Sequence, residues 1–234
     1  MLYISALLAM IAVCVVVILC MDRFKKVRLT NCIFFFVTFF CYLALVLIVY
    51  SDVGAEDWNF RNTLPLANVS PFMFFSTLLY FVLPDRGKPY YLRLLSLLSV
   101  GMFLSPTLGC VHNAVIHYAF HPHFLLDYVA HFSLFLWGVY AVRSGQVTLG
   151  KKESLISGSF IVGVAVMMMI LNVIFDAAFF GLSLNGKHNI YNQVLVANSY
   201  LSALIYFAGL VAVLFAGYFF SKLILRISGK GESA

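Results

Sequence analysis

Two ionisable side chains, Asp127 and His131, stand four residues apart inside the long apolar segment Phe124–Val142. Residues at this spacing fall on one face of a helix, one turn from each other. An aspartate one turn from a histidine can fix the tautomer of the imidazole and raise its basicity, which a general base requires. Ionisable groups inside a membrane helix are costly and usually face a bundle interior or a watery cavity. The pair is therefore a candidate catalytic dyad, with harmless solvation of Asp127 at the membrane interface as the plain alternative.

Further polar side chains interrupt three other apolar stretches. Asn172 and Asp176 repeat the four-residue spacing near the end of one stretch. Asn68 and Ser70 stand near the start of a second stretch, and Asn198 near the start of a third. A serine hydroxyl acts as a nucleophile once a base accepts its proton, whereas amides and carboxylates can bind a polar substrate. The alternatives are structural, because membrane serines commonly bond their own backbone and asparagines commonly link helices.

The composition places most of the chain in lipid. Of 234 residues, 63% are hydrophobic and only 10% are charged, and the mean hydropathy is +0.98. Soluble domains carry roughly 25% charged residues, so a soluble chain of this length could not hide so much apolar surface. The five cysteines show no CxxC or metal-type spacing and predict no disulfide framework. We expect a multi-pass protein of the cell membrane.

Helix length sets the number of expected crossings, because a hydrocarbon core about 30 Å thick needs roughly 20 apolar residues. The segments of this length predict an all-α, polytopic membrane protein with seven transmembrane helices: Leu2–Cys20, Cys32–Tyr50, Leu64–Leu83, Tyr91–Cys110, Phe124–Val142, Leu155–Leu182 and Val194–Leu225. Pro71 and Pro106 lie inside the third and fourth segments and favour local kinks there. No linker divides the chain, so we expect a single domain, 1–234, with peripheral helices in 1–50 and a five-helix core in 64–225.

The basic residues indicate the orientation of these helices. Of the 15 lysines and arginines, all but Arg61 and Lys187 fall on one side of the predicted crossings. The residues on that side are Arg23, Lys25, Lys26, Arg28, Arg86, Lys88, Arg93, Arg143, Lys151, Lys152, Lys222, Arg226 and Lys230. The positive-inside rule then predicts an external N-terminus and a cytoplasmic C-terminus. We therefore interpret the net charge of +6 as a topology signal, and expect no nucleic-acid partner.

This orientation places the polar residues of the third to seventh segments in the outer half of the bilayer. At about 1.5 Å per helical residue, Asp127 lies roughly 5 Å and His131 roughly 10 Å below the outer end of their helix. Asn172 and Asp176 lie within two turns of the outer end of the sixth segment. We infer a polar cavity that opens outward among five helices, with the first two helices packed outside it.

Four histidines near the external side suggest a metal site as one alternative. They are His112, His117, His121 and His123. Zinc would need three or four ligands to converge, and Pro122 disfavours a continuous helix through the set. Histidines at a membrane interface are the plainer interpretation. We expect neither a metal nor a cofactor.

Short motifs of the chain resemble the YwaF family of bacterial integral membrane proteins. They are Leu64-Pro65-Leu66-Ala67-Asn68-Val69-Ser70, Ser105-Pro106-Thr107-Leu108-Gly109, His121-Pro122-His123-Phe124, Tyr128-Val129-Ala130-His131, and Asn172 with the residues that follow it. The resemblance covers roughly Thr63 to Tyr218. Distant eukaryotic relatives of that family are membrane acyltransferases that move fatty acyl chains between phospholipids. In them, a nucleophile on the helix that begins with the Leu-Pro motif works with a histidine on a later helix.

The resemblance implies that His131 is this later histidine. The characteristic histidine of the motif helix falls at Ala67 here, and the nucleophilic cysteine of the relatives falls near Leu66. Neither residue can perform that chemistry. An enzyme of this kind would need Ser70 as the nucleophile, activated by His131, with Thr63 or Cys110 as alternatives.

Two functional hypotheses follow from these residues. In the first, the protein is a lipid acyltransferase or hydrolase in which Ser70, His131 and Asp127 are catalytic and Asn68 or Asn198 stabilises the oxyanion. In the second, the protein is not catalytic and binds or passes a small polar molecule or a lipid headgroup. Membrane lipids are the expected partners in either case, and other membrane subunits are a further alternative. The substrate-binding candidates are Asn68, Asn172, Asp176 and Asn198.

Overall fold

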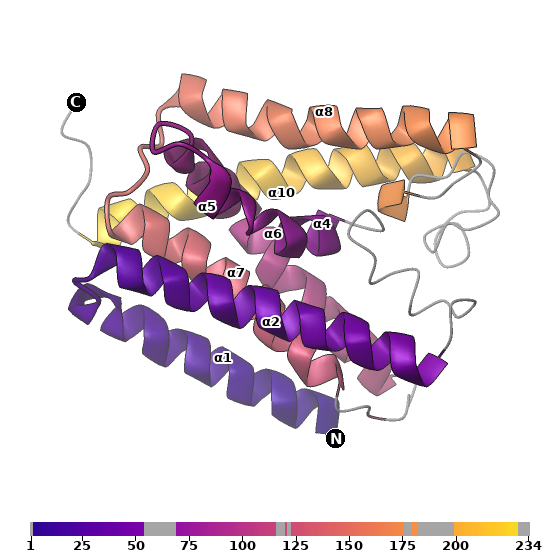
Figure 1. The fold of residues 1–234 in the computed structure, drawn as a ribbon, viewed down its shortest axis with the longest axis horizontal. Helices are drawn as coiled ribbons and strands as arrows, with labels where there is room; N and C mark the ends of the chain where they lie inside the picture. The colour runs from indigo at the N-terminus through magenta and orange to yellow at the C-terminus, as the bar shows by residue number, and fades with distance from the viewer. Residues whose placement is uncertain are drawn as a thin grey trace.

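The described residues form helices and no strand (Figure 1). The computed structural model describes residues 2–53, 69–115, 120, 123–175, 179–181 and 199–228. The helices are α1 (Leu2–Cys20), η1 (Met21–Arg23), α2 (Val27–Val53), α4 (Val69–Ser76), α5 (Leu79–Val82), α6 (Lys88–Val115), α7 (His123–Arg143), α8 (Lys151–Phe175), η2 (Phe179–Gly181) and α10 (Ser199–Ile227). The predicted all-α class is confirmed for this part of the chain.

Six of these helices are long and apolar enough to cross a membrane. They are α1 with η1, α2, α6, α7, α8 and α10, and they contain all or most of six predicted segments. This pattern is that of a multi-pass membrane protein. The third predicted segment is described from Val69 onward as α4 and α5, which are separated by a turn at Thr77 and Leu78. The count of seven crossings therefore stays a prediction.

Helix α7 lies at the centre of the bundle. Within its most apolar window 78% of residues are buried, compared with 17% in α1 and in α10. Helix α7 contacts α6, α2, α1, α10 and α4, whereas α8 and α10 pack against α6. In Figure 1, α1 and α2 therefore lie on one side of α6 and α7, and α8 and α10 on the other. The helix that carries Asp127 and His131 is thus the one most shielded from lipid.

Contacts between the ends of the helices gather the basic segments at one end of the bundle. The Arg143 guanidinium at the end of α7 forms a bidentate ion pair with Asp22, which follows α1, and its Nη1 donates to the Ile18 carbonyl at 2.7 Å. Near the start of α6, Arg93 donates from Nε to the carbonyl oxygen of Thr148 at 2.7 Å, in the connection that leads to α8. We call this the basic end of the bundle, and the opposite end, where α7 begins, the histidine end.

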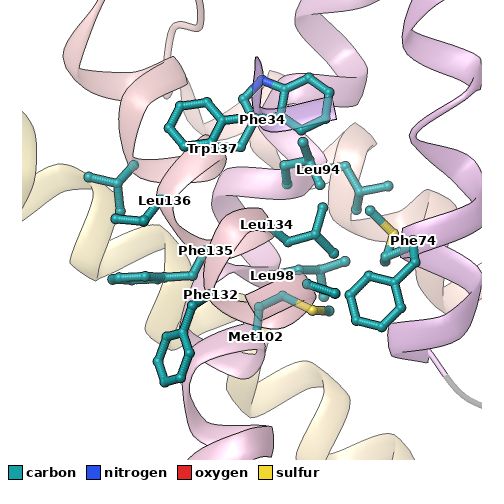
Figure 2. Packing of buried hydrophobic residues seen from close by; sticks show 14 of the residues in the cluster. Phe34, Phe74, Leu94, Leu98, Met102, Phe132, Leu134, Phe135, Leu136 and Trp137 are labelled. Atoms are coloured by element: carbon teal, nitrogen blue, oxygen red, sulfur yellow. The ribbon is translucent and has the colours of Figure 1, made fainter. Parts of the chain in front are cut away.

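Close backbone approaches hold α6 against its neighbours. A Cβ atom at Gly138 on α7 would lie 2.8 Å from the carbonyl oxygen of Leu95, and a Cβ atom at Gly217 on α10 would overlap the carbonyl of Leu97. Small residues allow membrane helices to approach this closely. Buried apolar side chains fill the remaining space around α7, and Figure 2 shows Phe74, Leu98 and Met102 gathered together in this core.

Candidate functional site

The predicted pair on α7 forms a direct contact. The Nδ1 atom of His131 lies 2.9 Å from the backbone carbonyl oxygen of Asp127 and 3.2 Å from its Oδ1 atom. Both partners are acceptors in the ionised aspartate, so Nδ1 carries the proton and donates it. In the neutral imidazole, Nε2 is then the unprotonated nitrogen. The four-residue spacing thus places a basic nitrogen at a defined position on the helix.

The free nitrogen of His131 is enclosed. The residue is only 4% exposed, and its Nε2 has no hydrogen-bond partner among the described residues. Buried polar atoms are normally hydrogen-bonded, and an exception needs an explanation such as a catalytic or ligand-binding role. The Asp127 side chain is 30% exposed and therefore connects this enclosed ring to the outside of the bundle.

Helix α4 supplies the aromatic wall of this site. The Phe74 ring packs edge-on against the imidazole of His131, with 4.7 Å between ring centroids and 89° between ring planes. Phe74 itself is 1% exposed and also contacts Tyr42 of α2. Helices α2, α4 and α7 therefore meet at His131.

Ser70 lies on the helix that reaches the site, although it does not bond the histidine. It stands one turn before Phe74 and is half-buried. Residues four apart share one helix face, so Ser70 lies on the face of α4 that carries Phe74. The structure shows no hydrogen bond between Ser70 and His131. The two candidates occupy neighbouring helices, and the aromatic ring is the group in contact.

Asn172 links the end of α8 to η2. Its Nδ2 donates to the Phe179 carbonyl oxygen at 2.9 Å, and the Phe179 N–H donates to its Oδ1 at 2.6 Å. The next residue, Phe180, has a φ of 56° and is fully buried, with its ring 5.6 Å from that of Phe72 on α4. The two hydrogen bonds of Asn172 hold η2 against the end of α8, and Phe180 packs η2 against α4. Asn172 therefore has a structural role. A substrate-binding role remains a prediction.

Several predicted site residues lie outside the described part of the chain. They are Asn68, Asp176 and Asn198, together with Thr63, Leu66 and Ala67 of the motif helix and the loop histidines His117 and His121. Their convergence on His131 stays a prediction. Within the described residues, no group of three or more His, Cys, Asp or Glu side chains could hold a metal ion.

Cys110, the alternative nucleophile, is engaged elsewhere. It is fully buried near the end of α6, and its thiol donates to the backbone carbonyl oxygen of Tyr3 on α1 at 2.8 Å. The contact gives Cys110 a packing role between α1 and α6. A buried thiol in apolar surroundings is also a poor nucleophile.

A polar cluster at the basic end was not found from the sequence. Asn31 of α2 donates from Nδ2 to the Tyr80 hydroxyl at 2.7 Å and to Oε1 of Gln146 at 2.6 Å, and it accepts a hydrogen bond from Nε1 of Trp137 at 3.0 Å. Asn31 is 1% exposed, so these bonds satisfy an otherwise costly buried amide. The cluster joins α2, α5, α7 and the connection after α7. The only sequence signal for it was a lone Asn near the start of an apolar helix.

Replacing Asn31 by alanine should lower the free energy of unfolding by about 1–2 kcal/mol. The indole N–H of Trp137, which is fully buried, would lose its acceptor, whereas the half-buried Tyr80 and Gln146 can turn toward water. Thermal unfolding in detergent, followed by near-ultraviolet circular dichroism, measures the change. Thr30→Ala is the matched control, because the Thr30 hydroxyl bonds the carbonyl of Lys26, the residue just before α2, and not another helix. Equal effects of the two substitutions would contradict a stabilising role for the cluster.

Comparisons of this chain with known proteins found no match. No family model, no curated protein and no solved structure matches it. The resemblance to the YwaF family therefore rests on the short motifs alone.

Proposed function

We propose that the protein is a seven-span membrane protein whose Asp127–His131 pair acts on the acyl esters of membrane phospholipids, by acyl transfer or hydrolysis. One observation carries this proposal: the Nδ1–H of His131 is held by Asp127, while its buried Nε2 has no partner among the described residues. A base with a fixed tautomer and a free second nitrogen is the arrangement that activates a hydroxyl nucleophile.

The proposed topology has an external N-terminus, a cytoplasmic C-terminus and the cell membrane as its location. It is supported by the contacts that bring the ends of α1, α5 and α7 and the start of α2 together at the basic end. Helices α4 and α5 follow α2 and precede α6 in the chain, and α5 reaches the basic end through Tyr80, so they would serve as the third crossing. The histidine end, with Asp127 and His131, would face the outside.

In the proposed reaction, Nε2 of His131 accepts the proton of the Ser70 hydroxyl as the serine oxygen attacks the ester carbonyl. The protonated imidazole, opposite the Asp127 carboxylate, returns that proton to the glycerol oxygen as the ester bond breaks. The hydroxyl of a lysolipid, or water, then attacks the acyl-serine while His131 takes its proton. His131 returns that proton to the Ser70 oxygen as the acyl-serine bond breaks, which releases the new phospholipid or the fatty acid. Asn68 or Asn198 would donate hydrogen bonds to the oxyanion.

A second candidate function is favoured by the packing of α4. The Phe74 ring of α4 packs against the imidazole, whereas no hydrogen bond joins Ser70 to it. In this alternative, His131 uses Nε2 only to bind a small polar molecule or a lipid headgroup, and the protein has no catalytic activity. Ser70 distinguishes the two candidates, because only the enzyme needs its oxygen.

The test uses purified protein in phosphatidylcholine nanodiscs with a phospholipid labelled in its acyl chain and a lysolipid acceptor. Acyl transfer or release of fatty acid is expected from the wild type, with an acyl adduct on Ser70 detected by peptide mass spectrometry. Ser70→Ala should reduce turnover to background. Ser76→Ala is the control, because that hydroxyl lies on the same helix and bonds the carbonyl oxygen and the sulfur of Met73, not His131. No turnover by folded wild type would overturn the enzyme proposal, and an adduct confined to Cys110 would overturn the assignment of Ser70.

A further inference from the structure

A groove opens between α8 and α10 near the basic end of the bundle. It has a volume of about 1020 Å³ and is bounded along most of its length by apolar side chains such as Leu155, Val162, Leu214 and Phe215. Few residues of either helix are buried, 22% of the most apolar window in α8 and 17% in α10, so in a membrane this groove would face lipid. Its volume is large enough for a lipid-sized ligand.

The polar lining of the groove is positively charged. Lys151 at the start of α8 and Lys222 and Arg226 near the end of α10 all line it. Lys222 also lies over the Tyr218 ring, with 5.9 Å from Nζ to the ring centroid. No carboxylate is among the described lining residues, and the α8 N-terminus adds its positive dipole end. The charges therefore gather at one end of an otherwise apolar groove.

An unpartnered hydroxyl completes this polar end. Ser154 lines the groove, is 7% exposed, and its Oγ has no hydrogen-bond partner among the described residues. Membrane serines normally bond the carbonyl one turn earlier, which makes this hydroxyl unusual. It lies one turn from Lys151 and can donate to an oxygen of a bound ligand.

We propose that this groove binds an anionic glycerophospholipid, with the phosphate at Lys151, Lys222 and Arg226 and an acyl chain along the apolar part. Basic pockets between membrane helices on the cytoplasmic side are suited to anionic headgroups. The charge complementarity favours a lipid over a second copy of the chain, whose own basic end would be repelled. The site depends on the membrane location but not on the proposed chemistry at His131, which lies toward the opposite end of α7.

The experiment measures lipid retention by native mass spectrometry in detergent, where no charged bilayer surface contributes. The probes are phosphatidylglycerol and, for comparison, phosphatidylcholine with the same acyl chains. The wild type should retain phosphatidylglycerol preferentially. Replacing Lys151, Lys222 and Arg226 together by Gln should weaken that retention on the order of 100-fold, at about 1 kcal/mol for each basic group.

Two variants separate this site from general electrostatic attraction. Replacing Lys25, Lys26 and Arg28 together by Gln removes the same charge from the same end but not from the groove, and retention should change by no more than about twofold. Ser159→Trp fills the apolar part from an exposed position and should also reduce retention, because the acyl chain loses its place. Equal loss in the two triple variants would overturn the proposal. So would a dimer in the wild type that Ser159→Trp dissociates, because a second copy would then occupy the groove.

Discussion

The His131→Ala variant is expected to lose acyl transfer or hydrolysis by about 10²–10⁴-fold, the usual contribution of a general base. The reason is the geometry of the ring: Nδ1–H is committed to Asp127, which leaves Nε2 as the atom that can take a proton. The loss should appear in kcat, because the proton is transferred in the transition state and not on binding. Turnover of acyl-labelled phospholipid in nanodiscs, as a function of lipid concentration, measures it.

The Asp127→Asn variant should lose less than His131→Ala. The carbonyl oxygen of Asp127 is a backbone atom, so it continues to accept from Nδ1 at 2.9 Å after the side chain changes. The substitution removes only the carboxylate charge that faces the imidazolium. Equal losses in the two variants would contradict this division between backbone and side chain.

A folding defect must be distinguished from a catalytic one, because His131 is buried against Phe74. His131→Gln keeps a polar group of similar length and should preserve the thermal unfolding temperature better than alanine while remaining inactive. His112→Ala is the matched control, since His112 is an exposed histidine at the same end of the bundle, on α6. If His131→Gln folds and retains full turnover, His131 is not the base.

Local features of this chain could be predicted from sequence because their cause is local. Hydropathy over about 20 residues marks a membrane helix whatever its neighbours, and the predicted first segment coincides with α1. The contact of His131 with Asp127 follows from helix geometry alone. Interactions within one helix can thus be predicted from the sequence before the tertiary structure is known.

The kinks expected at Pro71 and Pro106 stay predictions, whereas the third segment breaks at another residue. Pro71 stands in the first turn of α4, where the missing N–H leaves no bond unmade, and α6 runs continuously past Pro106. The break in the third segment comes instead at Thr77, whose hydroxyl bonds the Phe74 carbonyl at 2.6 Å. The Thr77 hydroxyl and the Thr77 N–H share this acceptor at the break. Serine and threonine hydroxyls can compete in this way at many positions of the sequence, so the position of the break could not be predicted.

Contacts between helices were beyond prediction because they depend on which faces meet. The Asn31 cluster joins residues up to 115 positions apart. The spacing of these residues in the sequence does not indicate that they are partners. Asn172 stood out in the sequence as a polar residue of an apolar helix, but nothing there indicated Phe179 as its partner or the left-handed Phe180 that follows. The burial of polar atoms could be anticipated, whereas their partners could not.

The Gly217→Ala variant is expected to destabilise the bundle by about 3 kcal/mol or more, although alanine favours helix over glycine. The added methyl would overlap the Leu97 carbonyl group, which is backbone and cannot rotate away. Helices α6 and α10 would have to separate, which weakens the packing along their whole contact. Thermal unfolding in detergent measures the loss. Gly209→Ala, at an exposed position of α10 with open space around it, is the matched control and should leave the stability unchanged or slightly raised.

A double-mutant comparison tests whether a clash with the backbone causes the loss of stability expected for Gly217→Ala. At Gly101, on the same interface, an added Cβ would meet the Val213 side chain, with 2.8 Å to Cγ1. Val213→Ala should therefore rescue Gly101→Ala in part. Leu97→Ala should not rescue Gly217→Ala, because the obstructing carbonyl remains after the side chain is truncated. Rescue in both pairs would mean that side chains alone set the distance between α6 and α10. The close backbone approach at Gly217 would then not stabilise this interface.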